Sequence, residues 1–374
     1  MAITRYLHIR LMKQKEKVVI IGAGLSGLTL AYELEKKGIR SLVLEASDRI
    51  GGRIHTQKGA NGTPLELGAT WFADKHISLM TLIKELSIQK FDQFSSGISI
   101  FQTRSFEPPQ KFFIPESEAP SYRIAGGTQV IIDTLVSNLK SSLIEKESKA
   151  VKIEEVPDGV AIYTANGKVY EAERICICIP PALAGASINF TNDISAYVPK
   201  VLPTVHTWMA GSIKFVLEYQ TPFWRNNGLS GTLFSHAGII TEMYDHTNFE
   251  TDRFGFTGFL NPGAAAYNIH KRKELVLRQL GELFGEDAAM PVSYLDKIWN
   301  NEFIVSGSQV IESPHQNNGH PIFQISYLNN KLFFSGTETV THFGGYMEGA
   351  VYAALKTAEK INSSLEKTKT HCSR

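Results

Sequence analysis

Three glycines and one glutamate form the pattern in this chain that most directly indicates chemistry. Gly22, Gly24 and Gly27 have the spacing of a turn in which the backbone approaches a nucleotide pyrophosphate. In such a turn the first glycine permits the tight bend, the second permits the close approach, and the third lets the next helix pack on the preceding strand. Glu45 stands where a carboxylate accepts hydrogen bonds from a ribose diol and repels a 2′-phosphate. We therefore expect NAD or FAD rather than NADP, with Ser26 as a further contact.

The elements around this turn are those that a dinucleotide site needs. Residues 18–21 are a short β-branched apolar run, typical of a buried parallel strand. Apolar residues recur at helical spacing over residues 25–34, and Gly38 ends this helix before a second strand at residues 41–44. The positive end of the helix then faces the phosphates. A glycine-rich turn without nucleotide is the alternative, but the ordered strand, helix and strand favour the nucleotide.

The residues after Glu45 separate FAD from NAD. Arg49, Gly51, Gly52 and Arg53 resemble the extension that follows this unit in the flavin amine oxidase family, which includes monoamine and polyamine oxidases. The resemblance implies that both arginines supply positive charge along the FAD pyrophosphate, while the glycine pair allows close backbone approach. Taken without the resemblance, the same residues could form a solvated basic loop.

A second segment, near the C-terminus, carries the same resemblance. Residues 332–339 contain a predicted strand that runs into a polar turn, and a helix follows that starts without bulky side chains at Gly344 and Gly345. The free amides and the dipole of a helix start stabilise negative charge, which a flavin ring acquires on two-electron reduction. An ordinary strand and glycine-started helix is the alternative.

The resemblance assigns roles to individual residues of this segment. It implies that Thr337 and Glu338 hold the ribityl chain, that Met347 lends its backbone amide to the ring, and that Tyr346 is one wall of an aromatic cage around the substrate. In the middle of the chain, the backbone near Val151 is expected at the adenine edge. Further expected cofactor contacts are Gly68, Ala69, Thr70, Gly336 and Gly345.

Lys214 lies in a segment with strand alternation, residues 211–217. A single lysine in a strand, considered alone, is expected to face solvent. The resemblance implies instead that Lys214 reaches flavin N5 through a water, where dioxygen meets the reduced ring. A cation there favours the superoxide-like charge that forms. Lys214 and Tyr346 are therefore the predicted catalytic residues.

The chain departs from monoamine oxidases at two positions next to the predicted cage. Gln309 stands where those enzymes attach the flavin through a cysteine, and Val310 stands where their second cage tyrosine would be. We therefore expect noncovalent FAD and an incomplete cage, because an aromatic pair orients an amine through its π faces and excludes water. Trp71 and Trp208, with Val310, are the candidate substrate-pocket residues.

The chain also resembles a short member of the family. Relatives carry a long helical insertion between two segments of the FAD domain, and here only residues 76–122 remain. A lower and more open roof over the active site is the expected consequence.

Composition argues against several partner classes. Lys plus Arg is 38 and Asp plus Glu is 37, so no polyanionic partner such as nucleic acid is expected. No run approaches the ~20 apolar residues of a membrane span, and charges interrupt residues 1–17 where a signal peptide needs an apolar core. We expect a cytoplasmic protein without a membrane partner, and the oligomeric state stays open.

Histidines and cysteines do not form a recognisable metal or redox motif. Cys176 and Cys178 alternate along a predicted strand and are interpreted as small buried residues. His315 and His320 lie in a polar stretch without a carboxylate or cysteine to complete a ligand set, which favours a polar loop. His342, beside the glycine helix start, is given a structural role, and no metal is expected.

Together these patterns predict an α/β fold: a Rossmann-type FAD-binding domain with a discontinuous α+β substrate domain, as in amine oxidases. Residues 149–179 should form a small antiparallel meander within the FAD domain. The expected bounds are an N-terminal leader, 1–16; an FAD-binding domain from 17–75, 121–203 and 303–366; a substrate domain from 76–120 and 204–302; and a polar tail, 367–374.

The resemblance implies FAD-dependent oxidation of an amine to an imine, then an aldehyde or ketone, with dioxygen reduced to hydrogen peroxide. Two alternatives stay open: a flavin-dependent dehydrogenase, desaturase or isomerase that acts on a non-amine substrate, and a flavin-binding protein without turnover. The sequence does not identify the substrate beyond a small molecule, expected to be an amine.

Overall fold

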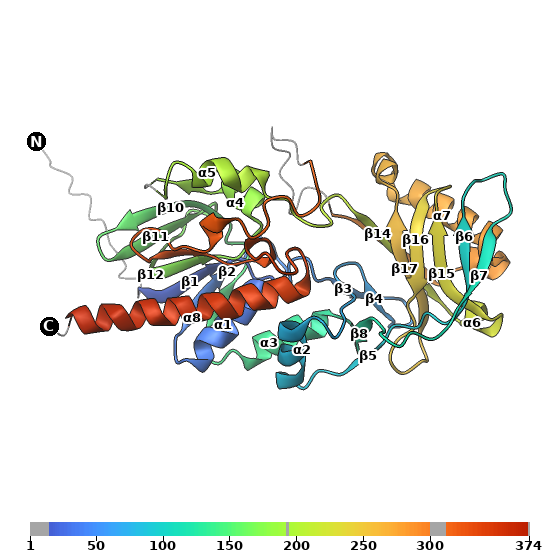
Figure 1. The fold of residues 1–374 in the computed structure, drawn as a ribbon, viewed down its shortest axis with the longest axis horizontal. Coiled ribbons are helices and arrows are strands. Elements are labelled where there is room, and N and C mark those ends of the chain that lie inside the picture. Colours follow the sequence, from blue (N-terminus) through green and yellow to red (C-terminus); the bar gives the residue numbers. More distant parts are fainter. Residues whose placement is uncertain (1–14, 192–193, 300–311, 373–374) are drawn as a thin grey trace, which may run out of the picture.

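The computed structural model describes residues 15–191, 194–299 and 312–372. It has two lobes, each built around a large sheet (Figure 1). One sheet has eight strands and the other has seven. Strands from distant parts of the chain meet in each sheet, so both lobes are assembled discontinuously.

The eight-stranded sheet has the order β13-β10-β11-β12-β1-β2-β9, with β19 also paired to β12. Strands β12, β1, β2 and β9 run parallel, whereas β10, β11 and β12 form an antiparallel meander. The bounds are β1 Glu16–Ile21, β2 Ser41–Leu44, β9 Leu143–Glu145, β10 Ala150–Val156, β11 Gly159–Thr164, β12 Val169–Ile177, β13 Asn189–Phe190 and β19 Leu332–Phe334.

Strand β1 lies inside this sheet, between β12 and β2, and both of its faces are covered. Ile20 pairs with Cys176 on one side and Val43 on the other, and all three side chains are fully buried. A continuous β-branched run suits such a position, where neither face meets water. The interpretation of Cys176 as a small buried strand residue is confirmed.

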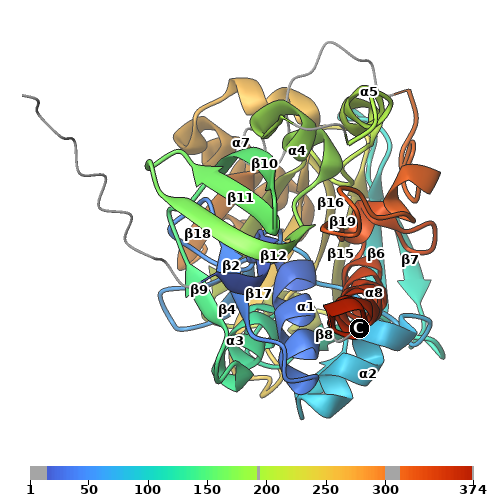
Figure 2. The same ribbon diagram turned by 90° about the vertical axis from the view of Figure 1, so that its left-hand side faces the viewer.

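Helices cover one face of the sheet, with α1 and α8 lying side by side (Figure 2). Leu28 and Leu34 of α1 share a buried apolar core with Val351 of α8. The carboxylate of Glu348 in α8 accepts hydrogen bonds from the backbone N–H groups at the start of α2, which joins the two helices. The bounds are α1 Leu25–Lys36, α2 Ile77–Glu85, α3 Gln129–Asn138 and α8 Met347–Cys372.

Short helices cover the opposite face of the sheet and complete its second apolar core. These are α4 Pro181–Ser187 and α5 Val198–Val201, followed by the 3-10 turn Leu202–Thr204. Two small two-stranded sheets are made by β3 Thr56–Lys58 with β4 Pro64–Glu66 and by β5 Lys90–Asp92 with β8 Tyr122–Ile124.

The seven-stranded sheet has the order β18-β14-β17-β16-β15-β6-β7, and its neighbours are antiparallel except for the parallel pair β15 and β6. The bounds are β6 Gly97–Gln102, β7 Gln110–Ile114, β14 Ile213–Tyr219, β15 Leu229–Ser235, β16 Ile240–Asp245, β17 Phe254–Leu260 and β18 Ser293–Ile298; the helices are α6 Phe223–Asn226 and α7 Ile269–Phe284.

Alternation along β14 separates the two faces of this sheet. Phe215 and Leu217 pack in one core with Val276 and Leu280 of α7. Lys214 therefore points to the opposite face, because successive strand residues alternate. Residues on that opposite face line the candidate functional site.

The predicted strands at residues 18–21 and 41–44, the helix between them and the meander are confirmed. The last helix differs from expectation at both ends. It begins at Met347 because Gly345 has φ +91°, which a right-handed helix does not accommodate. It also continues to Cys372, into the segment predicted as a polar tail, residues 367–374. The predicted domain bounds themselves stay a prediction.

Candidate functional site

A cavity of about 940 Å³ runs from the glycine turn after β1 to the open face of the seven-stranded sheet. This volume lies in the upper part of the range usual for small-molecule sites. We call it the central cavity. Its two ends are made by different sheets: one end lies near β1 and the other near β14.

The glycine turn after β1 borders the cavity as its spacing predicts. Gly22, Gly24 and Ser26 line the cavity, whereas Gly27 does not. A Cβ atom on Gly27 would lie only 1.9 Å from the carbonyl oxygen of Gly22, so a glycine is required for helix α1 to pack this closely. The turn therefore opens the N-terminal end of α1 towards the cavity.

A second glycine pair lies against the first. The backbone N–H of Gly51 donates to the carbonyl oxygen of Ala23 at 2.8 Å. Gly52 has φ +57°, and a Cβ atom there would lie 3.2 Å from Cα of Gly24. Both glycines line the cavity, and side chains in their place would narrow it.

Glu45 is held rigidly at the carboxyl end of β2, where it lines the cavity. Its Oε2 accepts a hydrogen bond from the backbone N–H of Ala23 at 2.8 Å, and its Oε1 accepts from the backbone and hydroxyl of Ser47. The glycine turn thus fixes the position of the Glu45 carboxylate, which we expect to accept hydrogen bonds from a ribose.

The two arginines line the cavity but are engaged differently. Arg49 donates to the carbonyl oxygens of Gly52 and Ile54, which ties the loop together. Arg53 donates to both carboxylate oxygens of Glu338, at 2.5 and 3.1 Å, and the Glu338 side chain is fully buried. Glu338 is not among the lining residues, so the structure shows it as the partner that positions Arg53.

The adenine contact is expected at the backbone near Val151, close to the start of β10. Val151 does not line the cavity, whereas Ser148, Lys149 and Ala150 do. Ala150 is the first residue of β10, and the side chain of the next strand residue points to the other face. The adenine contact itself stays a prediction, and the cavity reaches the chain directly before Val151.

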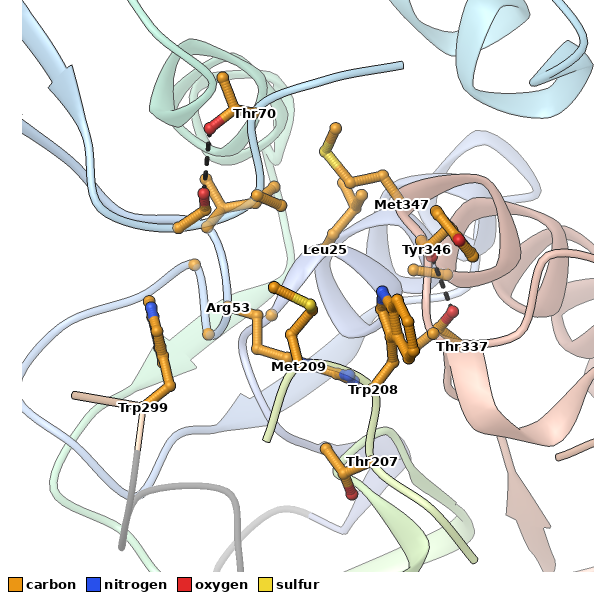
Figure 3. A pocket seen from close by; sticks show the side chains of 18 of the residues that line it. Leu25, Arg53, Thr70, Thr207, Trp208, Met209, Trp299, Thr337, Tyr346 and Met347 are labelled. Carbon is orange, nitrogen blue, oxygen red and sulfur yellow. Dashed lines mark hydrogen bonds between the residues drawn. The ribbon is translucent and has the colours of Figure 1, made fainter. Parts of the chain in front are cut away.

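The segment before α8 closes the cavity with an aromatic group. Gly336, Thr337, Gly345, Tyr346 and Met347 all line it. The Thr337 hydroxyl donates to the carbonyl oxygen of Tyr346 at 2.7 Å and so fixes the start of the helix (Figure 3). Tyr346 is 40% exposed, so its ring faces open space.

Trp208 is the candidate wall that the structure brings to Tyr346. Their rings are stacked at 27° with centroids 6.1 Å apart. The ring of His315 also stacks on Trp208, with centroids 4.3 Å apart and an interplanar angle of 23°. His315 lies in a turn, as the prediction of a polar loop expects, and its ring also supports the cavity wall. Gln309 and Val310 lie outside the described residues.

Trp71 lines the cavity beside Lys214 of β14. Its indole N–H donates to Gln93 at 2.8 Å, and its ring lies edge-on to Tyr244 with centroids 5.2 Å apart. The Nζ of Lys214 is 4.8 Å from the centroid of the Trp71 ring. Trp71 is thus fixed beside the predicted catalytic lysine.

Lys214 is 2% exposed and lines the cavity, so the expectation from the isolated strand pattern, a solvent-facing lysine, was wrong. Its Nζ donates to the carbonyl oxygen of Gly68 at 2.7 Å and to the hydroxyl of Thr70. Gly68, Ala69 and Thr70 also line the cavity. Burial lowers the pKa of Lys214 to about 7, against the attraction of the Glu66 carboxylate, which acts to raise it.

Sequence reasoning missed the residues that the open sheet face contributes to the cavity. They are dispersed along several strands, and no local spacing connects them. Period-two alternation could have shown that Glu242 and Tyr244 share a face, but not that this face is covered. The missed lining residues include Gln93, Thr232, Phe234, Glu242, Tyr244 and Phe259.

Two further properties of the described residues bear on the expected partners. Over residues 15–191, 194–299 and 312–372, no group of three or more His, Cys, Asp or Glu side chains is placed to hold a metal ion. Within the same described part of the chain, no helix has the length and apolar character needed to cross a membrane.

The cavity fits the dinucleotide that its sequence predicts. Helix α1 has no acidic residue in its first turn and no side-chain cap at Gly24, so its amides and positive dipole are available to a phosphate. The glycine pair leaves room for the pyrophosphate, and Arg49 and Arg53 add positive charge beside it. The cavity then continues to Lys214 and Tyr346, where a ring system would meet its substrate.

Comparisons with known proteins agree with this geometry. The family model described as flavin containing amine oxidoreductase matches residues 25–104 and 101–362. Amine oxidase (flavin-containing) B of Mus musculus is 24% identical over 465 residues, which cover 95% of this chain and 88% of that protein. A probable flavin-containing monoamine oxidase A of Dictyostelium discoideum is 24% identical over 457 residues, which cover 94% and 98%.

Solved structures show a similar fold. A putrescine oxidase bound to putrescine superposes with a TM-score of 0.79 at 20% identity, covering 94% of this chain and 99% of that one. Cyclohexylamine oxidase from Brevibacterium oxydans IH-35A gives a TM-score of 0.81 at 21% identity, covering 94% and 100%. At these identities the likeness shows the fold, and it confirms the predicted Rossmann-type architecture with its second domain.

Proposed function

This chain belongs to the flavin containing amine oxidoreductase family, and from that premise we propose that it oxidises an amine to an imine while dioxygen is reduced to hydrogen peroxide. Family membership makes it an FAD-dependent, amine oxidase-like enzyme. The imine product, its hydrolysis to an aldehyde or ketone, and noncovalent attachment of FAD are the proposal. The observation that carries it is a single cavity joining Glu45 to Lys214 and Tyr346.

A bound FAD supplies the electron acceptor: the carbon that bears a neutral amine loses the equivalent of a hydride, the nitrogen loses a proton, and dioxygen gains both electrons and both protons. The chain's own residues bind and orient. The names of the putrescine and cyclohexylamine oxidases indicate amine substrates, which supports an amine here.

Lys214 is the group that we propose to act on dioxygen. Two of its three N–H donors are directed at Gly68 and Thr70, so the side chain is oriented and, among the described residues, one donor stays available to a water or dioxygen. A buried cation stabilises negative charge that develops on oxygen more strongly than an exposed one does.

Trp208 and Tyr346 are proposed to orient the amine. Their nearly parallel rings present apolar faces that exclude water and attract a substrate through its π or cationic groups. The phenol of Tyr346 faces open space, so the ring can contact a bound substrate. No protein base is required if the amine arrives unprotonated.

The test is anaerobic reduction of the purified, yellow protein. Bleaching of the flavin by members of a panel of primary amines supports the proposal, and admission of dioxygen should then restore the colour and yield hydrogen peroxide. Bleaching only by apolar non-amines would point to a dehydrogenase or desaturase instead, and no bleaching at all would contradict turnover. Acid precipitation should release free FAD, whereas yellow colour in the pellet would contradict noncovalent attachment.

A further inference from the structure

We propose that Glu242 makes this enzyme selective for amines that carry a second cationic group, and that its carboxylate binds this second charge at the β16 end of the central cavity. The inference rests on the proposed oxidation of amines and names the substrate class of that same site. The position of Glu242 on the cavity wall, its free acceptor capacity and its distance from Lys214 carry the argument.

Glu242 belongs to a row of side chains that crosses the seven-stranded sheet. Lys214 pairs with Phe259, Phe259 with Glu242, and Glu242 with Phe234. Side chains at paired positions lie on the same face of a sheet, and all four of these line the cavity. Because neighbouring strands are about 4.8 Å apart, the Lys214 and Glu242 backbones are separated by roughly 10 Å.

This separation suits a substrate with an amine group at each end. Phe259 lies between the two charged residues in the row and offers an apolar surface to a methylene chain. One end of the substrate would then lie near Lys214, where the predicted chemistry occurs, and the other end near Glu242. A simple monoamine of the same length would place a methyl group at Glu242 instead.

Glu242 has unused acceptor capacity. Among the residues that the structure describes, the carboxylates that line the cavity are Glu45 and Glu242, and Glu45 is engaged by the turn near β1. The Tyr244 hydroxyl donates to Oε2 of Glu242 at 2.9 Å, and Glu242 makes no ion pair with any residue that the structure describes. An ionised carboxylate offers about four acceptor positions, so several are left for an ammonium group.

The surroundings of Glu242 favour an organic cation over water. Phe234 and Phe259 flank it in the row, and the ring of Tyr244 lies 5.2 Å from that of Trp71. Aromatic faces attract ammonium groups, and a half-buried carboxylate among them is stabilised by a cation that a ligand brings. A substrate carboxylate would be repelled from the same position.

Lys214 would orient such a substrate. Its charge repels an ammonium group and the Glu242 charge attracts one, so the charged end of a diamine is directed to Glu242. The end that has lost its proton is then the one beside Lys214. Since only the neutral amine can be oxidised, the two residues together select the productive orientation.

The experiment compares hexylamine with hexamethylenediamine, which have the same chain length and differ in the second amine. We expect kcat/KM for turnover with dioxygen to be at least about tenfold higher for the diamine. Glu242→Gln should reduce this ratio by about tenfold or more, because the amide keeps the shape and loses the charge. Glu282→Gln, an exposed carboxylate on α7 that does not line the cavity, is the matched control and should keep the wild-type ratio.

The outcomes separate the two proposals. Bleaching by neither amine would contradict amine oxidation itself. Equal kcat/KM values for the two amines in the wild type, or an unchanged ratio in Glu242→Gln, would overturn the role of Glu242 and leave amine oxidation standing.

A binding measurement keeps the inference testable if Glu242→Gln does not fold. Hexamethonium, a dication that cannot become a neutral amine, should inhibit the wild type competitively and at least about tenfold more tightly than the hexyltrimethylammonium ion. Equal inhibition constants for the two ions would overturn the inference.

Discussion

The indole ring of Trp208 lies at 27° to the ring of Tyr346, with centroids 6.1 Å apart, although 138 positions of the chain, 346 minus 208, separate the two residues. Figure 3 shows the two side chains close together at the start of α8. His315 stacks on Trp208 and supports it. Of the two tryptophans proposed as candidate walls, Trp208 is thus the one that pairs with Tyr346, while Trp71 lies beside Lys214.

Trp208→Ala should lower kcat/KM for the best amine substrate by roughly two- to tenfold, since an aromatic pair contributes about 0.5–1.5 kcal/mol beyond its buried area. Trp208→Phe keeps an aromatic face and should recover most of the loss. Steady-state turnover with dioxygen measures kcat/KM for both variants. Indistinguishable kcat/KM values for the alanine variant and the wild type would contradict the role of Trp208.

Lys214→Met should slow the reaction of the reduced enzyme with dioxygen by about tenfold or more, and should slow anaerobic reduction by a smaller factor. The reason is that the cation acts on charge that develops on oxygen. Lys297→Met is a matched control, because Lys297 lies opposite Lys214 on the neighbouring strand β18 but does not line the cavity. Equal slowing of both half-reactions would argue against an oxygen-directed role.

The two half-reactions should respond to pH in opposite directions. Burial lowers the pKa of Lys214 to about 7, so the cation is lost as pH rises through this value and reoxidation should slow. Reduction should accelerate over the same range, because the fraction of neutral amine increases. Rapid-mixing measurements from about pH 6 to about pH 9 give the rates of flavin reduction and reoxidation separately. A flat reoxidation profile would show that Lys214 is not the titrating group.

Lys214 should also make the free energy of unfolding depend on pH. Its pKa falls from 10.5 when exposed to about 7 in the fold, so between these values the unfolded chain binds more protons and stability rises with pH. The slope is at most about 1.4 kcal/mol per pH unit. Urea unfolding at about pH 7 and pH 9 should show a larger free energy of unfolding at the higher pH in the wild type, and a smaller increase in Lys214→Met. The same increase in both proteins would refute the contribution of Lys214.

Arg53→Met should destabilise the protein strongly, because it leaves the fully buried Glu338 carboxylate without its bidentate partner. Removal of one member of a buried ion pair typically costs about 3–5 kcal/mol. The double variant Arg53→Met with Glu338→Leu should recover part of that loss in urea unfolding, since no unpaired charge is left. A single variant as stable as the wild type would mean that solvent reaches Glu338 and screens it.

The dinucleotide end of the cavity could be predicted because its determinants are local. Gly22, Gly24, Gly27 and Glu45 lie within one strand, helix and strand, and each acts through backbone geometry that short-range spacing specifies. The role of Glu338 was less accessible, because its partner Arg53 is 285 residues away.

The substrate end was decided by tertiary structure alone. Alternation along a strand shows which side chains share a face, as for Glu242 and Tyr244, but not whether that face meets water or another lobe. Lys214 illustrates the difference: its strand pattern suits solvent exposure, and only the packing of Gly68 and Thr70 against it makes it a buried group with a lowered pKa. The sequence by itself determined the fold class and the cofactor, because these depend on local backbone geometry. The residues that meet the substrate depend on which sheet faces come together.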